Sequence, residues 1–151
     1  MNKSFRSAGL LCAVLGASFL VNSLATRQSV AFTSPIPNLV GTWKVETQGA
    51  TLLRGTNFSN RSHHAGEITT LTAEATIQKQ EGRRVLGVFK SPRYTEKFAW
   101  VIGVDGKSLA GVDEDGFIDG KIVTPNRIEV FYRHVNANES VVAAGTYTRQ
   151  K

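Results

Sequence analysis

Histidines that could bind a metal ion are concentrated in one short stretch of the sequence. His63 and His64 are adjacent, Glu67 follows them, and His134 lies much later in the chain. Adjacent side chains on an extended backbone point in opposite directions, so two neighbouring histidines rarely bind one ion. We therefore predict that this stretch is a solvated loop and that the protein has no metal site and no cofactor.

Acidic residues recur between Asp113 and Asp119, with Asp115 between them. This spacing superficially resembles a calcium-binding loop, but Phe117 and Gly120 break the pattern of an EF-hand. An Asp-Gly pair within the segment is typical of a tight turn. We expect these acidic residues to form a hairpin turn.

Sequence motifs of enzyme catalysis are missing from the chain. It contains no Gly-x-Ser-x-Gly element and no glycine-rich phosphate loop, and its single cysteine is Cys12. Glu96 and Glu129 could act together as a general acid and base if both were buried. Charged residues on alternating strands are more often exposed, so we predict no catalytic residue.

Aromatic residues are the best candidates for contacting a ligand. They lie in segments where apolar and polar residues alternate, which places one set of side chains on an inner face. Small residues such as Gly87, Gly103 and Ala143 could leave a cavity there, or could let large neighbours pack, which is the interpretation we favour. The candidate ligand-binding residues are Phe89, Phe98, Trp100, Tyr132 and Tyr147.

The same alternation predicts an all-β fold. Glycine and Asp-Gly or Glu-Gly pairs recur at short intervals and leave few gaps that could hold a helix. The segment 67–81 also fits helical spacing, but its four threonines favour a strand, and 48–66 is expected to be one long loop. The predicted strands lie near 40–47, 71–80, 83–90, 96–104, 107–113, 116–123, 126–134 and 140–149. An eight-stranded antiparallel up-and-down barrel is the simplest arrangement, because closure removes exposed sheet edges, and a sandwich is the alternative.

The strand segments begin with Gly41-Thr42-Trp43, and this motif resembles the start of the calycin-type barrels. In the lipocalins the tryptophan of a Gly-x-Trp motif plugs the closed end, and avidins begin with Gly-Thr-Trp. A lipocalin resemblance implies an apolar ligand inside the barrel, which adds Trp43 to the candidate ligand-binding residues beside its role as a core plug. Avidin resemblance would imply biotin, but avidins follow the tryptophan with an Asn and a Ser that bind the ureido group, whereas the downstream residues here are Val45, Thr47 and Ala50.

The remainder of the domain is similar to small exported bacterial barrels of the allene oxide cyclase type. The motifs that carry this resemblance are turns and strand starts, found at 79–84, 101–107, 113–116 and 145–149. The resemblance covers roughly residues 39–150 and implies architecture more than activity.

The N-terminal segment has the pattern of a secretory signal peptide. Lys3 and Arg6 precede an uncharged stretch from Ser7 to Thr26. Cleavage is expected after residue 25 or residue 31, with an uncleaved membrane anchor as the alternative. We therefore expect a signal segment at 1–31, a linker at 32–38 and the barrel domain at 39–151, in a periplasmic or secreted protein.

Charge and composition narrow the range of partners. Removing residues 1–31 takes away three of the 18 basic residues, so the net charge falls from +6 to +3. The same cleavage removes Cys12, which leaves no disulfide, thiolate nucleophile or Cys-bound zinc. The basic residues at 83–97 alternate with aromatic and acidic residues, and we interpret them as a solvated exterior. We predict no nucleic-acid partner and no membrane contact beyond the leader.

These observations favour a noncatalytic exported barrel that binds a small apolar or amphipathic ligand. One alternative is an enzyme similar to allene oxide cyclase that acts on a lipid-derived substrate. Another is a structural or interaction module of the cell envelope, which an exposed apolar patch would indicate.

Overall fold

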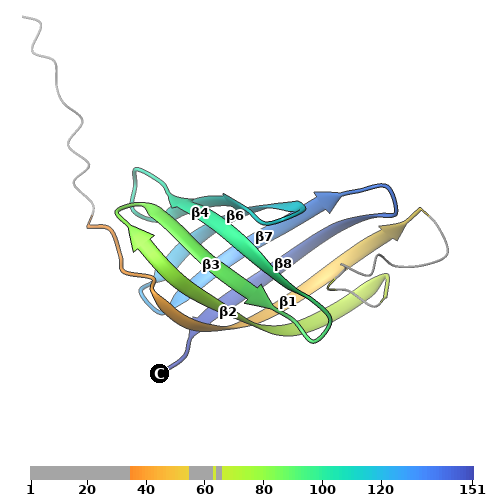
Figure 1. The fold of residues 1–151 in the computed structure, drawn as a ribbon, viewed down its shortest axis with the longest axis horizontal. Coiled ribbons are helices and arrows are strands. Elements are labelled where there is room, and N and C mark those ends of the chain that lie inside the picture. The colour runs from red at the N-terminus through yellow and green to blue at the C-terminus, as the bar shows by residue number, and fades with distance from the viewer. Residues whose placement is uncertain (1–34, 55–62, 64–65) are drawn as a thin grey trace, which may run out of the picture. The chain divides into compact units, whose positions relative to one another are not determined.

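The computed structural model describes residues 35–54, 63 and 66–151, and these form a closed antiparallel barrel (Figure 1). Each strand pairs with the next along the chain, and the last pairs with the first, as the sequence predicts. Among these residues, no helix is long and apolar enough to cross a membrane. The predicted signal segment lies outside the described residues. The strands are β1 (Gly41–Leu53), β2 (Ile68–Glu81), β3 (Arg84–Lys90), β4 (Thr95–Ile102), β5 (Ser108–Val112), β6 (Gly116–Thr124), β7 (Arg127–Val135) and β8 (Glu139–Arg149).

The first strand is longer than the sequence predicts. The loop expected over 48–66 is wrong for its first residues, because β1 continues to Leu53. Residues 48–53 pair with 139–144 of β8, and Ala50 still pairs with Ile68 of β2. Small and polar residues have weak strand propensity, but hydrogen bonding to two neighbouring strands outweighs it. The threonine-rich segment that follows the β1–β2 loop is the strand β2, as expected.

Inward-facing side chains fill the middle of the barrel. Phe98 and Trp100 stack with ring centroids 4.3 Å apart, and Tyr147 meets Trp100 edge to face. Glycine lies beside each of the two stacked rings: a Cβ on Gly87 would lie 2.3 Å from the Phe98 ring, and one on Gly111 would lie 2.2 Å from the Trp100 ring. The small residues here therefore let large neighbours pack, which is the interpretation that the sequence favoured.

One end of the barrel is closed by Trp43 and the residues just before β1. Trp43 and Leu39 are fully buried, and the Trp43 Nε1–H donates to the Leu39 carbonyl over 3.0 Å. The Arg149 guanidinium lies 4.4 Å above the indole ring and donates to the carbonyls of Val40 and Asn38 at 2.7 Å each. These contacts give Trp43 the position of a plug.

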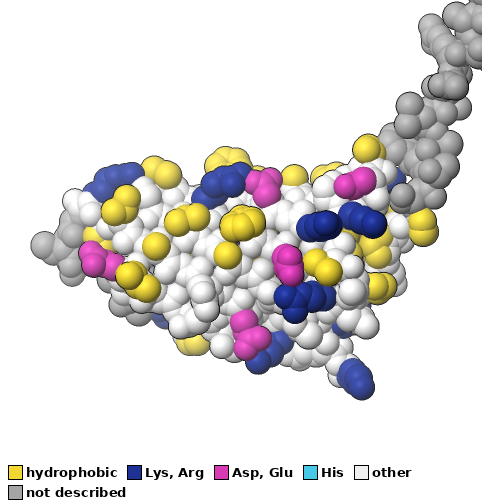
Figure 2. Space-filling view, turned by 180° about the vertical axis from the view of Figure 1, so that it is seen from behind, with side chains coloured by type: hydrophobic (Ala, Val, Ile, Leu, Met, Phe, Trp, Pro, Cys, Tyr) yellow, Lys and Arg dark blue, Asp and Glu magenta, His cyan; other side chains and the backbone are white. Residues whose placement is uncertain are grey.

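The outer surface mixes apolar and charged side chains. Figure 2 shows hydrophobic side chains spread between basic and acidic ones on the face seen from behind. The exposed ion pairs of the barrel include Arg127–Glu129 and Arg133–Asp119. On this face the apolar groups are not gathered into the single patch that an interaction module would present.

Candidate functional site

A cavity of about 50 Å³ lies among inward-facing residues from seven strands, the β5–β6 turn and the loop before β2. A single water needs roughly 10–15 Å³ on this measure, so the space can take a small group of atoms. Most of its wall is apolar, and a few polar groups gather within it, which is the usual composition of a ligand site. The lining residues are Thr47, His63, Leu71, Phe89, Glu96, Phe98, Asp113, Ile118, Val130, Tyr132, Ala143 and Tyr147.

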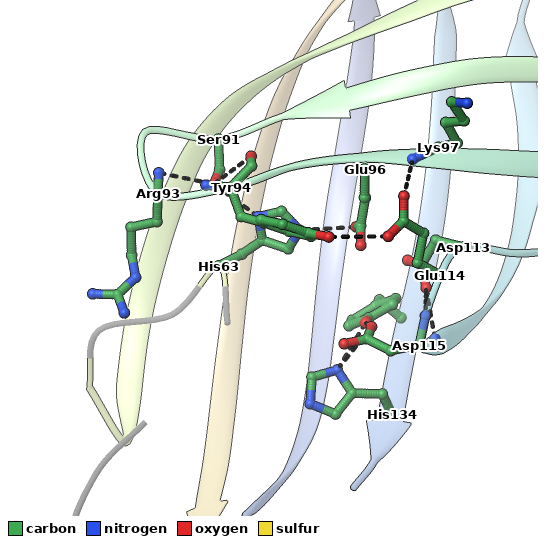
Figure 3. A network of polar contacts seen from close by, with 12 residues as sticks. His63, Ser91, Arg93, Tyr94, Glu96, Lys97, Asp113, Glu114, Asp115 and His134 are labelled. Atoms are coloured by element: carbon green, nitrogen blue, oxygen red, sulfur yellow. Dashed lines mark hydrogen bonds and ion pairs between the residues drawn. The ribbon is translucent and has the colours of Figure 1, made fainter. Parts of the chain in front are cut away.

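His63 and Glu96 form the central polar contact of this site (Figure 3). The His63 Nε2 lies 2.8 Å from the Glu96 Oε1, and the two side chains are only 9% and 4% exposed. The expectations of a solvated loop for His63 and of an exposed Glu96 are therefore wrong. Glu96 is buried because it shares the inner face of β4 with Phe98 and Trp100. That period-two relation to Phe98 was the sequence signal that could have identified it.

Ser91 holds the other side of the same imidazole. Its Oγ lies 2.7 Å from the His63 Nδ1, which gives a serine, histidine and glutamate in the order of a hydrolase triad. The same Oγ also accepts the backbone N–H groups of Arg93 and Tyr94 at 3.2 and 3.1 Å. Ser91 is buried and does not line the cavity. It therefore shapes the β3–β4 turn and orients His63 rather than presenting a nucleophile.

Asp113 brings a second carboxyl group to the cavity. Its Oδ1 accepts the backbone N–H groups of Asp115 and Gly116 at 3.2 and 2.6 Å, so the predicted hairpin turn is present. One carboxylate oxygen from each of Glu96, Asp113 and Asp115 lies within 4.8 Å of the others. Burial, followed by the negative charge of Glu96, raises the pKa of Asp113 to about 7. Carboxylate oxygens are also the ligands that hard cations prefer. The sequence did not predict that these three carboxyl groups lie together.

A second buried network adjoins these carboxyl groups. The Tyr132 hydroxyl donates to the Asp115 Oδ1 over 2.9 Å and lies 2.8 Å from the His134 Nδ1. Because a hydroxyl has one proton, His134 Nδ1–H is then the donor to the Tyr132 oxygen. On its other side, His134 Nε2 lies 3.4 Å from the fully buried Glu139. Burial and the nearby negative charges of Asp113 and Asp115 raise the pKa of Tyr132, so the hydroxyl stays a donor.

The structure brings most of the predicted ligand-binding residues to one cavity. Phe89, Phe98, Tyr132 and Tyr147 line it, whereas Trp43 and Trp100 do not. Trp43 belongs to the closed end, and Trp100 is packed in the filled middle. The sequence did not predict that the polar residues His63, Glu96 and Asp113 belong to this site.

The raised pKa of Asp113 predicts that the stability of the protein depends on pH. Its pKa is raised from 3.8 to about 7 in the fold, so the folded state binds more protons than the unfolded chain between these values. Stability is therefore expected to fall as pH rises from 4 to 7, by about 1–2 kcal/mol after allowance for solvent screening. Asn in place of Asp113 keeps an acceptor for the turn and should remove this contribution.

The measurement is urea unfolding of the wild type and the Asp113→Asn variant at pH 4.5 and pH 7.5. We expect the variant to gain stability relative to the wild type at pH 7.5 but not at pH 4.5. Asp119→Asn, an exposed aspartate on β6, is the matched control and should show no such pH-dependent difference. An equal shift of the Asp113 variant at both pH values would contradict the assignment.

Comparisons with known proteins identify no family. No family model matches the chain, and no curated protein matches it. Among solved structures, a redesigned β-barrel is 11% identical, with a TM-score of 0.46 over 75% of this chain and 92% of its own. A de novo designed fluorescence-activating β-barrel is 13% identical, with a TM-score of 0.44 over 74% and 93%. An S-type phycobiliprotein lyase from Guillardia theta is 11% identical, with a TM-score of 0.33 over 74% and 88%.

Proposed function

We propose that this protein is an exported barrel that binds one small amphipathic molecule in the cavity beside His63 and Glu96. The observation that carries the proposal is the cavity itself, in which an apolar wall surrounds a few polar groups. The filled middle and the Trp43 plug restrict the binding space to this part of the barrel. The signal-like N-terminal segment supports export to the periplasm or medium.

The position of Trp43 also supports a relation to calycin-type barrels. The Gly41-Thr42-Trp43 motif starts β1, and its indole is buried beneath Arg149 at one end of the barrel. This is the plug position that the lipocalin resemblance implies. On this proposal Trp43 stabilises the scaffold and leaves ligand contact to the residues around the cavity.

Ala143 offers a direct test of the cavity. It lies on the inner face of β8 and lines the cavity, whereas its neighbour Ala144 faces outward. Ala143→Leu adds bulk to the binding space and should abolish ligand retention or weaken binding at least tenfold. Ala144→Leu adds the same atoms outside and should leave binding unchanged.

Native mass spectrometry of the exported protein, purified without organic solvent, measures any retained ligand. A noncovalent adduct present in the wild type and in Ala144→Leu, but lost in Ala143→Leu, is the expected result. An adduct that survives in Ala143→Leu would place the ligand elsewhere. An adduct-free protein that also binds none of a set of small amphipathic probes would contradict the proposed function.

A second candidate is an enzyme similar to allene oxide cyclase. It is favoured by one observation: Asp113, with a pKa raised to about 7, lies beside Glu96 at the cavity. A carboxyl group with a pKa near the working pH can donate and accept a proton, as general acid–base catalysis requires. Analysis of the bound molecule for deuterium at carbon after incubation in ²H₂O distinguishes the two candidates. An enzyme that transfers protons to or from carbon would incorporate deuterium there, and a binding protein would not.

A further inference from the structure

We propose that the ligand of this cavity carries a cationic amine, held by Glu96 and Asp113, with a short apolar chain against the wall. This inference rests on the proposed function and specifies its ligand class. It starts from the charges that line the cavity, where Glu96 and Asp113 are present and neither Lys nor Arg is among the lining residues.

The acidic groups are held close together, and the basic side chains beside them are histidines: His63 contacts Glu96, and the His134 Nδ1 lies 3.6 Å from the Asp115 Oδ1. The carboxylate oxygens of Glu96, Asp113 and Asp115 lie within 4.8 Å of one another. His63 is the one lining residue that can become cationic, and it contacts Glu96 through a single oxygen, Oε1. Lys97, the next residue along β4, is exposed on the outer face. A cation entering the cavity would therefore lower the repulsion between two carboxyl groups.

A second, independent feature points to a polar ligand in the same space. Thr47 follows Trp43 and Val45 on the inner side of β1 and lines the cavity. Its Oγ1 is buried and makes no hydrogen bond within the described part of the chain. Buried hydroxyl groups almost always have a partner, so this oxygen is suited to accept from a bound molecule. An ammonium group has three donors and no acceptor, which matches a site rich in acceptors.

The apolar wall favours an organic cation over a metal ion. Leu71, Phe98, Ile118 and Val130 surround the space beside the carboxyl groups and offer nothing to a hydrated ion. Some of the acidic oxygens are also occupied, since Asp113 accepts two backbone N–H groups and Asp115 accepts the Tyr132 hydroxyl. An alkyl chain against this wall would gain burial energy of roughly 0.8 kcal/mol per CH₂ group.

The test compares three probes of matched size by isothermal titration calorimetry at pH 7.5: n-butylamine, n-butanol and butyrate. We expect the Kd of butylamine to be at least tenfold lower than that of butanol, and butyrate to bind most weakly. Glu96→Gln should reduce the preference for the amine over the alcohol to about twofold or less. Glu129→Gln makes the same change at an exposed site on β7 and should keep the preference.

A second variant guards against a folding defect. Asp113→Asn keeps the acceptor for the β5–β6 turn and should also weaken butylamine binding while leaving butanol binding unchanged. Thermal unfolding of each variant establishes that the barrel is folded at the temperature of the titration.

The outcomes separate this inference from the proposed function. If butanol or butyrate binds as tightly as butylamine, and Ala143→Leu abolishes that binding, the cavity is a ligand site and the cationic class is wrong. If Ca²⁺ binds in a Glu96-dependent manner without any preference for the amine, the class is also wrong and the cation is a metal. If none of the three probes binds, and native mass spectrometry shows no adduct, both proposals fail.

Discussion

Replacing Trp43 by alanine is expected to lower the free energy of unfolding by about 3–5 kcal/mol, the range typical of a large aromatic side chain removed from a core. The indole is fully buried, and its Nε1–H donates to the Leu39 carbonyl. Its removal leaves a cavity, an unpaired carbonyl and an Arg149 guanidinium that has lost the aromatic face beneath it. Because small domains have stabilities of about 5–15 kcal/mol, a loss of this size takes a large part of the total.

Urea unfolding followed by tryptophan fluorescence from Trp100 measures this effect. Trp43→Phe is the matched control, because it keeps most of the apolar volume and loses the N–H donor, and it should cost clearly less than the alanine variant. Under conditions where Trp43→Ala is folded, its ligand affinity should equal that of the wild type, since Trp43 does not line the cavity. A stability loss below about 1 kcal/mol would contradict the role of Trp43 as the plug.

Adding a single methyl group at Gly111 is the second change with a large expected effect. A Cβ there would lie 2.2 Å from the Trp100 ring and 2.6 Å from the carbonyl oxygen of Ala99. The ring is packed between Phe98 and Tyr147, and the carbonyl belongs to the β4–β5 ladder, so neither can move aside easily. Overpacking of a filled core typically costs 1–3 kcal/mol, and we expect Gly111→Ala to reach about 3 kcal/mol because one of the clashing atoms is backbone.

Ala110→Val provides the control for this prediction. Ala110 precedes Gly111 on β5 and faces outward, so a larger substitution there adds apolar bulk to the exterior. It should change the free energy of unfolding by no more than about 0.5 kcal/mol. If Gly111→Ala is tolerated as well as Ala110→Val, the middle of the barrel is not filled as described, and a larger binding space than the cavity at His63 becomes available.

Together these two variants test which parts of the barrel determine its stability and which determine ligand binding. Substitutions at the plug and in the filled middle should change stability and leave binding intact, whereas Ala143→Leu should change binding. The distinction matters because an eight-stranded barrel is just wide enough either to be filled by side chains or to hold one small ligand. Here the inner side chains fill the middle of the barrel and leave a cavity of about 50 Å³ at another place along it.

The strand pattern could be predicted because it is a local property. Period-two alternation in segments such as 96–102 and 127–134 reports directly which residues face inward, and Asp-Gly or Glu-Gly pairs mark the turns. The prediction was wrong where that signal is weak. Residues 48–51 are small or polar, and only the pairing of 48–53 with β8 and of 48–50 with β2 makes this segment part of a strand.

By itself, the sequence predicted an all-β barrel, its strand order, the burial of Trp43, Phe98, Trp100 and Tyr147, and the start at Gly41-Thr42-Trp43. Tertiary structure alone decided the site, because His63, Glu96 and Asp113 come from three separated segments that the folded barrel brings together. The raised pKa of Asp113 has the same origin, since burial and the charge of Glu96 both depend on contacts distant in the chain. Alternation along a strand specifies which way a side chain points, but the registers between strands determine what it meets there.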